Sequence, residues 1–190
     1  MREIGDRLAQ LGYAVLLPNV FYRVGRYRPF RMDTVFSDPD ERARLMALVR
    51  GLTSDMMIRD AFAYLEFLAG LPETSGSACG TTGYCLGGRA SLLTAAYHSD
   101  RVAAAASFHG GNLASDSDPN SPHLHADRSR ADVYVAAARD DTSFPREQFD
   151  RLQQAFTAAG VTYTLETYPA EHGFAVPDMP TYNRAADRAH

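Results

Sequence analysis

The chain has 190 residues with 19 basic and 23 acidic side chains, which gives a formal net charge of −4 at pH 7. This length is typical of one domain with its own hydrophobic core, and we expect a single domain over residues 1–190. A mildly acidic chain offers no basic surface for nucleic acid, and no apolar run reaches the roughly 18 residues that a membrane span needs. We therefore expect neither a nucleic-acid nor a membrane partner.

All 19 basic residues are arginines. Chemistry that needs a lysine, such as Schiff-base formation or a Walker-type phosphate site, is therefore excluded. The first residues lack the charged and then apolar pattern of a signal peptide, and the two cysteines are too few for a disulfide framework. A cytoplasmic location with reduced thiols is the expectation.

Hydrophobic periodicity and turn signals predict helices that alternate with short apolar strands. The expected helices cover residues 1–11, 38–49, 54–69, 86–98, 145–159 and 179–190. The expected strands, which include the buried strand Val102–Phe108, cover residues 13–17, 77–82, 102–108, 133–138 and 161–168. Residues 19–38 and 110–130 are rich in turn-forming or irregular sequence and are expected to be loops.

Five strands alternating with helices predict the α/β class, with a mostly parallel sheet flanked by helices. The sequence opens with a helix that no strand precedes. We therefore expect that strands on the N-terminal side of this fold are missing from the chain and that its C-terminal end is slightly shortened.

A Gly-x-Cys-x-Gly motif, Gly83-Tyr84-Cys85-Leu86-Gly87, lies between a predicted strand and a predicted helix. In that context the motif indicates a nucleophile held on a tight turn at the carboxyl end of a strand. The helix N-terminus favours a thiolate, and the Leu86 N–H can face a developing oxyanion. The alternative is a glycine-rich turn around a structural cysteine.

A thiolate nucleophile needs a base, and the base needs a group that orients it. In this fold class the three follow in the order nucleophile, acid, histidine. Asp140 and Asp141 follow one downstream strand and His172 follows the next, which places all of them at the sheet edge where α/β sites form. The residues alone leave the choice between the two aspartates open.

Several stretches resemble the dienelactone hydrolase family, the cysteine-dependent members of the α/β-hydrolase fold. These stretches are GYAVLLPNVFYR, TTGYCLGGRA, AAASFHGG, VYVAAARDDTSFP and YPAEHGFAVPD. The resemblance implies an α/β-hydrolase fold, with Cys85 as nucleophile, His172 as base and Asp141 as the orienting acid. It also implies hydrolysis of a lactone or small carboxylic ester through an acyl-cysteine intermediate, without a cofactor or metal.

The sequence departs from the family pattern in two places. Members of the family carry a strand before the first helix, with a glutamate that controls thiol ionisation and a loop that supplies a second oxyanion donor. The founding members also carry an arginine four residues after the histidine, which binds the substrate carboxylate. Val176 stands at that position here, which argues against dienelactone itself as the substrate.

Four further residues are candidates near the site. Tyr84, His109 and Phe174 are expected to line the substrate pocket, although His109 is equally well explained by a structural hydrogen bond. Arg89, on the helix after the nucleophile, is interpreted as a structural ion-pair partner rather than a substrate clamp.

Two rival functions remain open from the sequence. One is a non-catalytic α/β scaffold whose site has decayed, and the other is a thiol redox sensor that uses Cys85 with Cys79 as a resolving partner. Cys79 by itself is interpreted as a small buried residue in a strand. His123 and His125 have a spacing that suits a metal, but without an obvious third ligand we interpret them as part of a surface loop.

Overall fold

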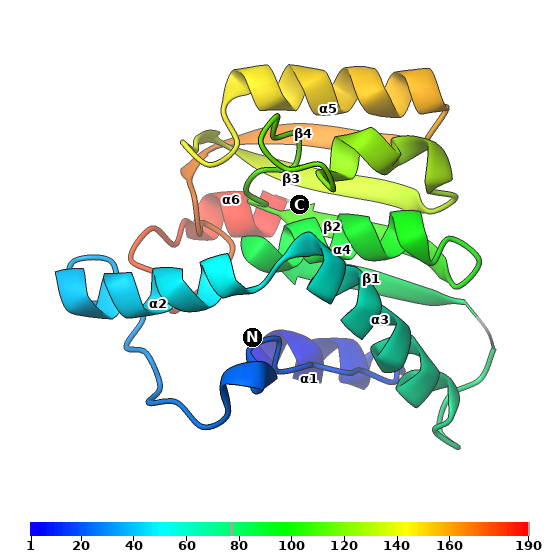
Figure 1. The fold of residues 1–190 in the computed structure, drawn as a ribbon, viewed down its shortest axis with the longest axis horizontal. Coiled ribbons are helices and arrows are strands. Elements are labelled where there is room, and N and C mark those ends of the chain that lie inside the picture. The colour runs from blue at the N-terminus through cyan, green and yellow to red at the C-terminus, as the bar shows by residue number, and fades with distance from the viewer. Residues whose placement is uncertain (77, 190) are drawn as a thin grey trace.

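Four parallel strands form the centre of the fold, and the computed structural model describes residues 1–76 and 78–189 (Figure 1). The strands are β1 (Cys79–Tyr84), β2 (Val102–Phe108), β3 (Asp132–Asp140) and β4 (Tyr163–Glu171). The helices are α1 (Arg2–Gln10), α2 (Pro39–Gly51), α3 (Ser54–Ala69), α4 (Leu86–Tyr97), α5 (Arg146–Ala159) and α6 (Arg184–Ala189). Two 3-10 helices, η1 (Tyr22–Val24) and η2 (Pro122–Arg128), lie in the segments expected to be loops.

The strands lie in the order β1-β2-β3-β4, and each neighbouring pair is parallel. All four carboxyl ends therefore meet at one edge of the sheet, as Figure 1 shows. The structure confirms the predicted fold class of helices around a parallel sheet. None of the helices in the described part of the chain has the length and apolar character needed to cross a bilayer.

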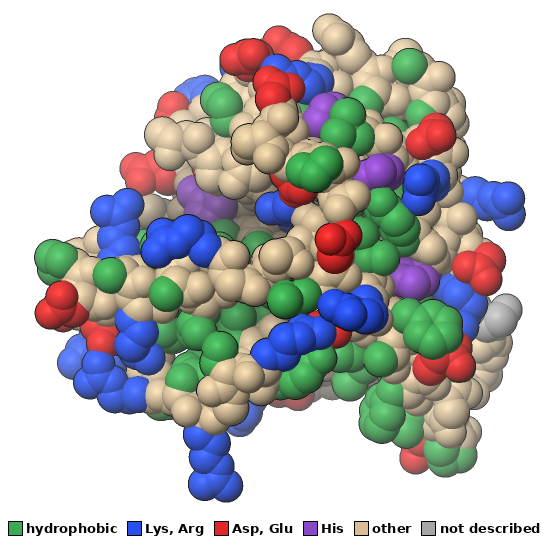
Figure 2. All heavy atoms as spheres, viewed as in Figure 1, with side chains coloured by type: hydrophobic (Ala, Val, Ile, Leu, Met, Phe, Trp, Pro, Cys, Tyr) green, Lys and Arg blue, Asp and Glu red, His purple; other side chains and the backbone are tan. Residues whose placement is uncertain are grey.

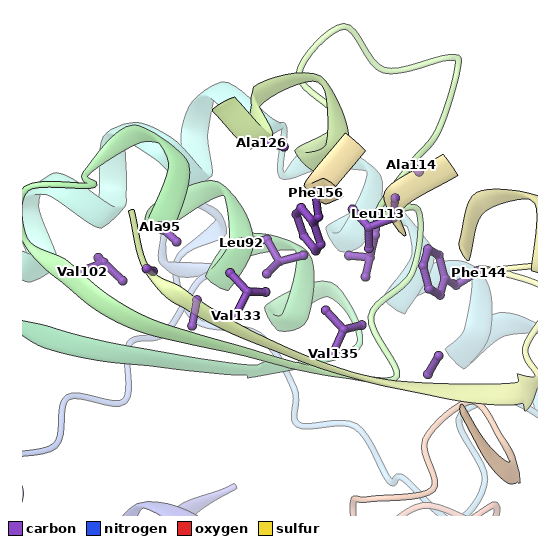
Figure 3. Close-up of a cluster of buried hydrophobic side chains, with 14 of the residues drawn as sticks. Leu92, Ala95, Val102, Leu113, Ala114, Ala126, Val133, Val135, Phe144 and Phe156 are labelled. Atoms are coloured by element: carbon purple, nitrogen blue, oxygen red, sulfur yellow. The ribbon is translucent and has the colours of Figure 1, made fainter. Parts of the chain in front are cut away.

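The main hydrophobic core lies between one face of the sheet and helices α4 and α5. The side chains of Leu92, Val133, Val135 and Phe156 meet there (Figure 3). On α5 the apolar residues Phe149, Leu152 and Phe156 recur at helical spacing, so that one stripe of the helix faces the sheet. This core fixes the strands whose ends carry the candidate site.

The predicted boundaries agree closely with the structure in the middle of the chain. The expected helix over 54–69 and strand over 102–108 match α3 and β2. Strand β3 extends further than expected at both ends, β4 begins at Tyr163 rather than 161 and ends later than expected, and the last helix begins at Arg184 rather than 179. The predicted strand over 77–82 begins at Cys79 and runs on through Tyr84, and its first residue, 77, lies outside the described residues.

The predicted strand over residues 13–17 is wrong. Tyr13, Val15 and Leu17 are 66%, 40% and 51% exposed, and the sheet ends at β1 instead. A cavity of about 2170 Å³ has residues 13–18 in its lining together with residues 80–84 of β1. An apolar run becomes a strand only where a neighbour completes its hydrogen bonds, and none of the described residues does so here. The sheet therefore has four strands where five were expected.

The same cavity corrects a second expectation, which concerns β2. This strand was expected to be buried, but Ala103 and Ala104 are exposed. Both residues line the cavity. Figure 2 shows apolar side chains at the surface in the hollow below α2. The helices thus cover the sheet unevenly, and the amino-terminal half of β2 is less covered than its carboxyl end.

Candidate active site

One candidate residue stands directly after each strand of the sheet. Cys85 follows β1, His109 follows β2, Asp141 follows β3 and His172 follows β4. Because the strands are parallel, the sheet brings these four positions to a single edge. The row arises from topology alone, since each residue is far from the others in sequence.

Cys85 occupies a strained turn between β1 and α4. Its backbone angles are φ 55° and ψ −120°, a region that non-glycine residues rarely adopt. The turn is tight enough that a Cβ on Gly83 would lie 1.9 Å from the carbonyl oxygen of Gly87. The motif glycine therefore permits the close approach of strand and helix, and the turn leaves the Cys85 side chain exposed.

His172 contacts both Cys85 and Asp141. Its Nε2 atom lies 2.9 Å from Cys85 Sγ, and its Nδ1 atom lies 2.7 Å from Asp141 Oδ2. A carboxylate can only accept hydrogen bonds, so Nδ1 carries the proton in this contact. The three groups thus form a continuous chain from thiol to carboxylate.

The second aspartate takes no part in this chain. Asp140 is the last residue of β3, exposed to solvent, and its carboxylate lies 3.4 Å from the guanidinium of Arg139. Asp141 is buried, with only 1% of its side chain exposed. Successive residues of a strand point to opposite sides, which explains why the neighbours have such different surroundings.

The surroundings of the three hydrogen-bonded groups favour an ionised Asp141 carboxylate and a protonated His172 imidazole. Burial would by itself raise the pKa of Asp141, but hydrogen bonds from His172 and Ser143 outweigh burial and hold that pKa below its ordinary value. Burial likewise opposes protonation of His172. The hydrogen bonds to Asp141 and Cys85 outweigh it and raise the pKa of His172 to about 10.

Leu86 is the first residue of α4, and its N–H therefore has no acceptor within the helix. It directly follows Cys85, so this N–H lies at the positive end of the helix dipole beside the thiol. An oxygen that develops negative charge near Cys85 could accept a hydrogen bond from it.

The three residues expected to line the pocket behave differently. Tyr84 and His109 line the cavity that also contains Cys85 and His172. Phe174 does not: it is fully buried, with its ring 5.4 Å from that of His109 and 5.5 Å from that of Tyr168. Gly173, at φ 97°, turns the chain between His172 and Phe174, so the two side chains point in different directions.

The buried ring of His109 packs against the imidazole of His172. His109 is 1% exposed, and its ring packs edge to face against that of His172 with the centroids 5.2 Å apart. Its backbone N–H donates to the carbonyl of Ala136 across the sheet, at 2.8 Å. The backbone at His109 has φ 39°, a departure from strand geometry that the sequence did not signal.

Arg89 is a structural ion-pair partner, as expected. Its guanidinium contacts the Asp118 carboxylate and the Ser54 hydroxyl, and Ser54 donates to the same carboxylate at 2.9 Å. The contacts join α4, α3 and the loop before η2. Burial lowers the pKa of Arg89.

The two histidines of the His-x-His motif bind to protein partners. His123 Nδ1 lies 3.1 Å from Ser121 Oγ, and His125 Nε2 lies 3.1 Å from the Tyr97 hydroxyl. They lie on η2 rather than in an irregular loop. Among residues 1–76 and 78–189, no three His, Cys, Asp or Glu side chains gather in a way that could hold a metal ion.

Cys79 cannot serve as an intramolecular resolving partner for Cys85 in this fold. The two thiols are free, and they stand at the start of β1 and directly after its end. A strand rises about 3.3 Å per residue, so roughly 20 Å separate them, whereas a disulfide needs Cα atoms within about 7 Å. Burial also raises the pKa of Cys79, which disfavours its thiolate.

Ser143 belongs to the site, although from the sequence it was noted only as part of the family-like stretch after Asp141 and was given no role. Its Oγ lies 2.6 Å from Asp141 Oδ1 and 3.1 Å from His172 Nδ1. The available signal was the spacing, because an aspartate in a turn commonly accepts a hydrogen bond from the backbone N–H two residues on, as Asp141 Oδ1 does from Ser143 at 2.8 Å.

The sequence comparisons with known proteins agree on one family. The dienelactone hydrolase family model matches residues 1–190. Carboxymethylenebutenolidase from Rhodococcus opacus is 30% identical over 192 residues, which cover 98% of this chain and 70% of that protein. A matching protein of Salmonella typhi is 30% identical over 193 residues, covering 98% of this chain. The chain spans 66% of the length of that relative.

Solved structures show the same relationship. A crystal structure from Klebsiella pneumoniae subsp. pneumoniae superposes with a TM-score of 0.80 at 26% identity, covering 99% of this chain and 75% of that one. The dienelactone hydrolase-like promiscuous phosphotriesterase P91 from metagenomic libraries gives a TM-score of 0.76 at 25% identity, covering 99% and 74%. The fold is that of the α/β-hydrolases, and the chain belongs to the dienelactone hydrolase family.

Proposed function

We propose that this chain hydrolyses a lactone or a small carboxylic ester through an acyl-cysteine intermediate. Cys85 is the nucleophile, His172 the general base and acid, and Asp141 the group that orients His172. The observation that carries the proposal is the continuous contact from Cys85 Sγ through the His172 imidazole to Asp141 Oδ2, beside a large cavity.

The first half of the reaction is acylation. The Cys85 thiolate attacks the ester carbonyl carbon and forms a C–S bond. The carbonyl oxygen takes up negative charge and accepts a hydrogen bond from the Leu86 N–H. The tetrahedral intermediate then collapses with cleavage of the C–O bond. The His172 imidazolium gives its Nε2 proton to the departing alkoxide, which leaves as an alcohol.

The second half is deacylation. Neutral His172 takes a proton from a water molecule as that water attacks the acyl-cysteine carbonyl. The C–S bond breaks, the carboxylic acid is released, and the thiolate and imidazolium are restored. Asp141 remains ionised throughout, because its role is to hold Nδ1–H and to stabilise the imidazolium.

Beside His172, the cavity wall offers an apolar side chain and not a cation to a carboxylate next to the reacting carbonyl. Val176, four residues after His172, lines the cavity. An apolar side chain there offers no hydrogen bond or charge to an anion and would desolvate it at a cost. The proposed substrates are therefore neutral lactones and esters of short acids.

A substrate panel with two matched cysteine variants tests the proposal. The protein would be assayed against p-nitrophenyl esters of increasing acyl length and against uncharged lactones. Hydrolysis of short esters should disappear in Cys85→Ala and persist in Cys79→Ala, because only Cys85 contacts His172. Hydrolysis that survives Cys85→Ala, or no hydrolysis of any member of the panel by the parent protein, would contradict the proposal and favour a non-catalytic scaffold.

A further inference from the structure

Ser143 directs two hydrogen-bond donors at one oxygen of Asp141. Its backbone N–H donates to Asp141 Oδ1 at 2.8 Å, and its hydroxyl donates to the same atom at 2.6 Å. The other oxygen, Oδ2, lies 2.7 Å from His172 Nδ1. With Oδ1 held in this way, rotation of the carboxylate is restricted and Oδ2 is the oxygen that faces the imidazole.

The Ser143 hydroxyl also reaches the imidazole itself. Its Oγ lies 3.1 Å from His172 Nδ1, and because its own proton goes to Asp141, a lone pair remains to share the Nδ1–H. Asp141 is almost completely buried, so water has little access to replace these contacts. Bonds to a buried ionised group are among the stronger hydrogen bonds in proteins.

The neighbouring loop leaves room for this hydroxyl. A Cβ on Gly111 would lie 2.8 Å from Ser143 Oγ, closer than real contacts allow. The N–H of Asn112 donates to the Ser143 carbonyl at 2.7 Å and ties the β3–α5 turn to the loop after β2. The hydrogen bond from Asn112 thus fixes the backbone of Ser143. At position 111, any side chain larger than that of glycine would displace the Ser143 hydroxyl.

We propose that Ser143 is a positioning residue for the reaction and that it acts on His172 through Asp141. The inference rests on the proposed function for its kinetic consequence, but the effect on His172 can be tested without a substrate. Loss of the hydroxyl leaves only the backbone N–H on Oδ1, so the carboxylate turns more freely and the imidazole is held less firmly.

Kinetics of three variants test the role of the hydroxyl. Ser143→Ala should lower kcat for a short ester about tenfold, the usual scale for a hydrogen bond to a charged group, in a protein that remains folded at the assay temperature. Ser143→Thr keeps a hydroxyl and should restore kcat to within about threefold of the parent. An equal loss in both variants would contradict the proposal, because shape rather than the hydroxyl would then matter.

A double-mutant cycle asks whether Ser143 acts through Asp141. In an Asp141→Asn background, Ser143→Ala should cause little further loss, since the group that it positions is already changed. A full additional tenfold loss would show that Ser143 acts by another route and would overturn the inference.

The pH dependence of Cys85 alkylation by iodoacetamide gives a readout that needs no ester. Ser143→Ala should shift the inflection that belongs to His172 to lower pH, because a loosely held carboxylate stabilises the imidazolium less. An unmoved inflection, or one shifted to higher pH, would overturn the inference. A parent protein that shows the His172 inflection but hydrolyses no ester would instead refute the proposed function alone.

A variant at Gly111, in the loop after β2, tests the same hydroxyl without changing Ser143 itself. Gly111→Ala places a methyl group against Ser143 Oγ and should reproduce the kcat and pH effects of Ser143→Ala. Gly51→Ala is the matched control, since a Cβ at Gly51 would meet nothing within 4 Å. If Gly111→Ala folds and has parent kinetics, the position of the hydroxyl does not matter and the inference fails.

Discussion

The Sγ atom of Cys85 lies 2.9 Å from Nε2 of His172, although the two residues are 87 positions apart and follow strands at opposite edges of the sheet. Neighbouring strands are about 4.8 Å apart, so three strand spacings, roughly 14 Å, separate β1 from β4. Because this separation exceeds the length of a side chain, the backbone after β4 must carry His172 toward β1, and its imidazole lies at the ends of the intervening strands. It rests there on His109, which follows β2, and on Asp141, which follows β3.

This arrangement predicts that the fall in hydrolysis rate at high pH depends on the leaving group of the ester. The contacts of His172 raise its pKa to about 10, so the imidazolium is present below that pH and is lost as the pH rises through it. An alkoxide needs the imidazolium proton in order to leave, whereas p-nitrophenolate leaves without one.

The measurement is kcat/KM against pH for an ethyl ester and for the p-nitrophenyl ester of the same acid. We expect a fall near pH 10 for the ethyl ester alone. A common alkaline limb for both substrates would show that His172 does not act as the acid in acylation.

The two adjacent aspartates should differ sharply in their effect on activity. Asp141→Asn replaces the carboxylate that faces His172 Nδ1, and the loss in kcat should be on the order of 10²–10⁴, as for orienting acids in related mechanisms. Asp140→Asn changes an exposed side chain that pairs only with Arg139 and should leave kcat within about twofold. Similar losses in the two variants would refute the assignment of Asp141.

The turn that holds Cys85 should tolerate a methyl group at one of its motif glycines and not at the other. A Cβ at Gly83 would collide with the backbone of Gly87 and Gly88, whereas a Cβ at Gly87 would meet nothing within 4 Å. Gly83→Ala should therefore lower the free energy of unfolding by at least about 3 kcal/mol or prevent folding. Gly87→Ala should stay within about 1 kcal/mol of the parent.

Denaturant titration followed by circular dichroism compares the two glycine variants. The matched pair separates the steric requirement of the turn from a general sensitivity to alanine. Equal stability of both variants would mean that the strand and helix do not approach as closely as the structure shows.

Much of the fold could be predicted because the hydrophobic patterns that define its helices and strands lie within short stretches of sequence. The apolar stripe of α3 and the run of small residues in β2 define those elements without reference to the rest of the chain. The same kind of signal failed at residues 13–17. An apolar run reports that a segment avoids water, but a strand also needs a hydrogen-bonding neighbour, and no sequence pattern within the run reveals whether one is present.

The residues of the candidate site likewise divide into those that the sequence could predict and those that it could not. Cys85 and His172 could be proposed because each follows a predicted strand in a known chain order, whereas the choice of Asp141 over Asp140 came from the resemblance to the family. The spacing of Ser143 from Asp141 was visible in the sequence, but its contact with His172 depends on turn geometry, and the support from His109 depends on a positive φ, neither of which the sequence expresses. Phe174 was misplaced for a similar reason, since the turn at Gly173 directs its ring into the core.

The most direct test of the central claim is to trap the acyl-enzyme. The protein would be mixed with p-nitrophenyl acetate, quenched in acid at short times, digested and examined by mass spectrometry, with Cys85→Ala as control. We expect a transient acetyl group on the peptide that contains Cys85 and none on the peptide that contains Cys79. Hydrolysis that proceeds with no acetyl group on Cys85, or with equal acetylation of Cys79, would contradict the account.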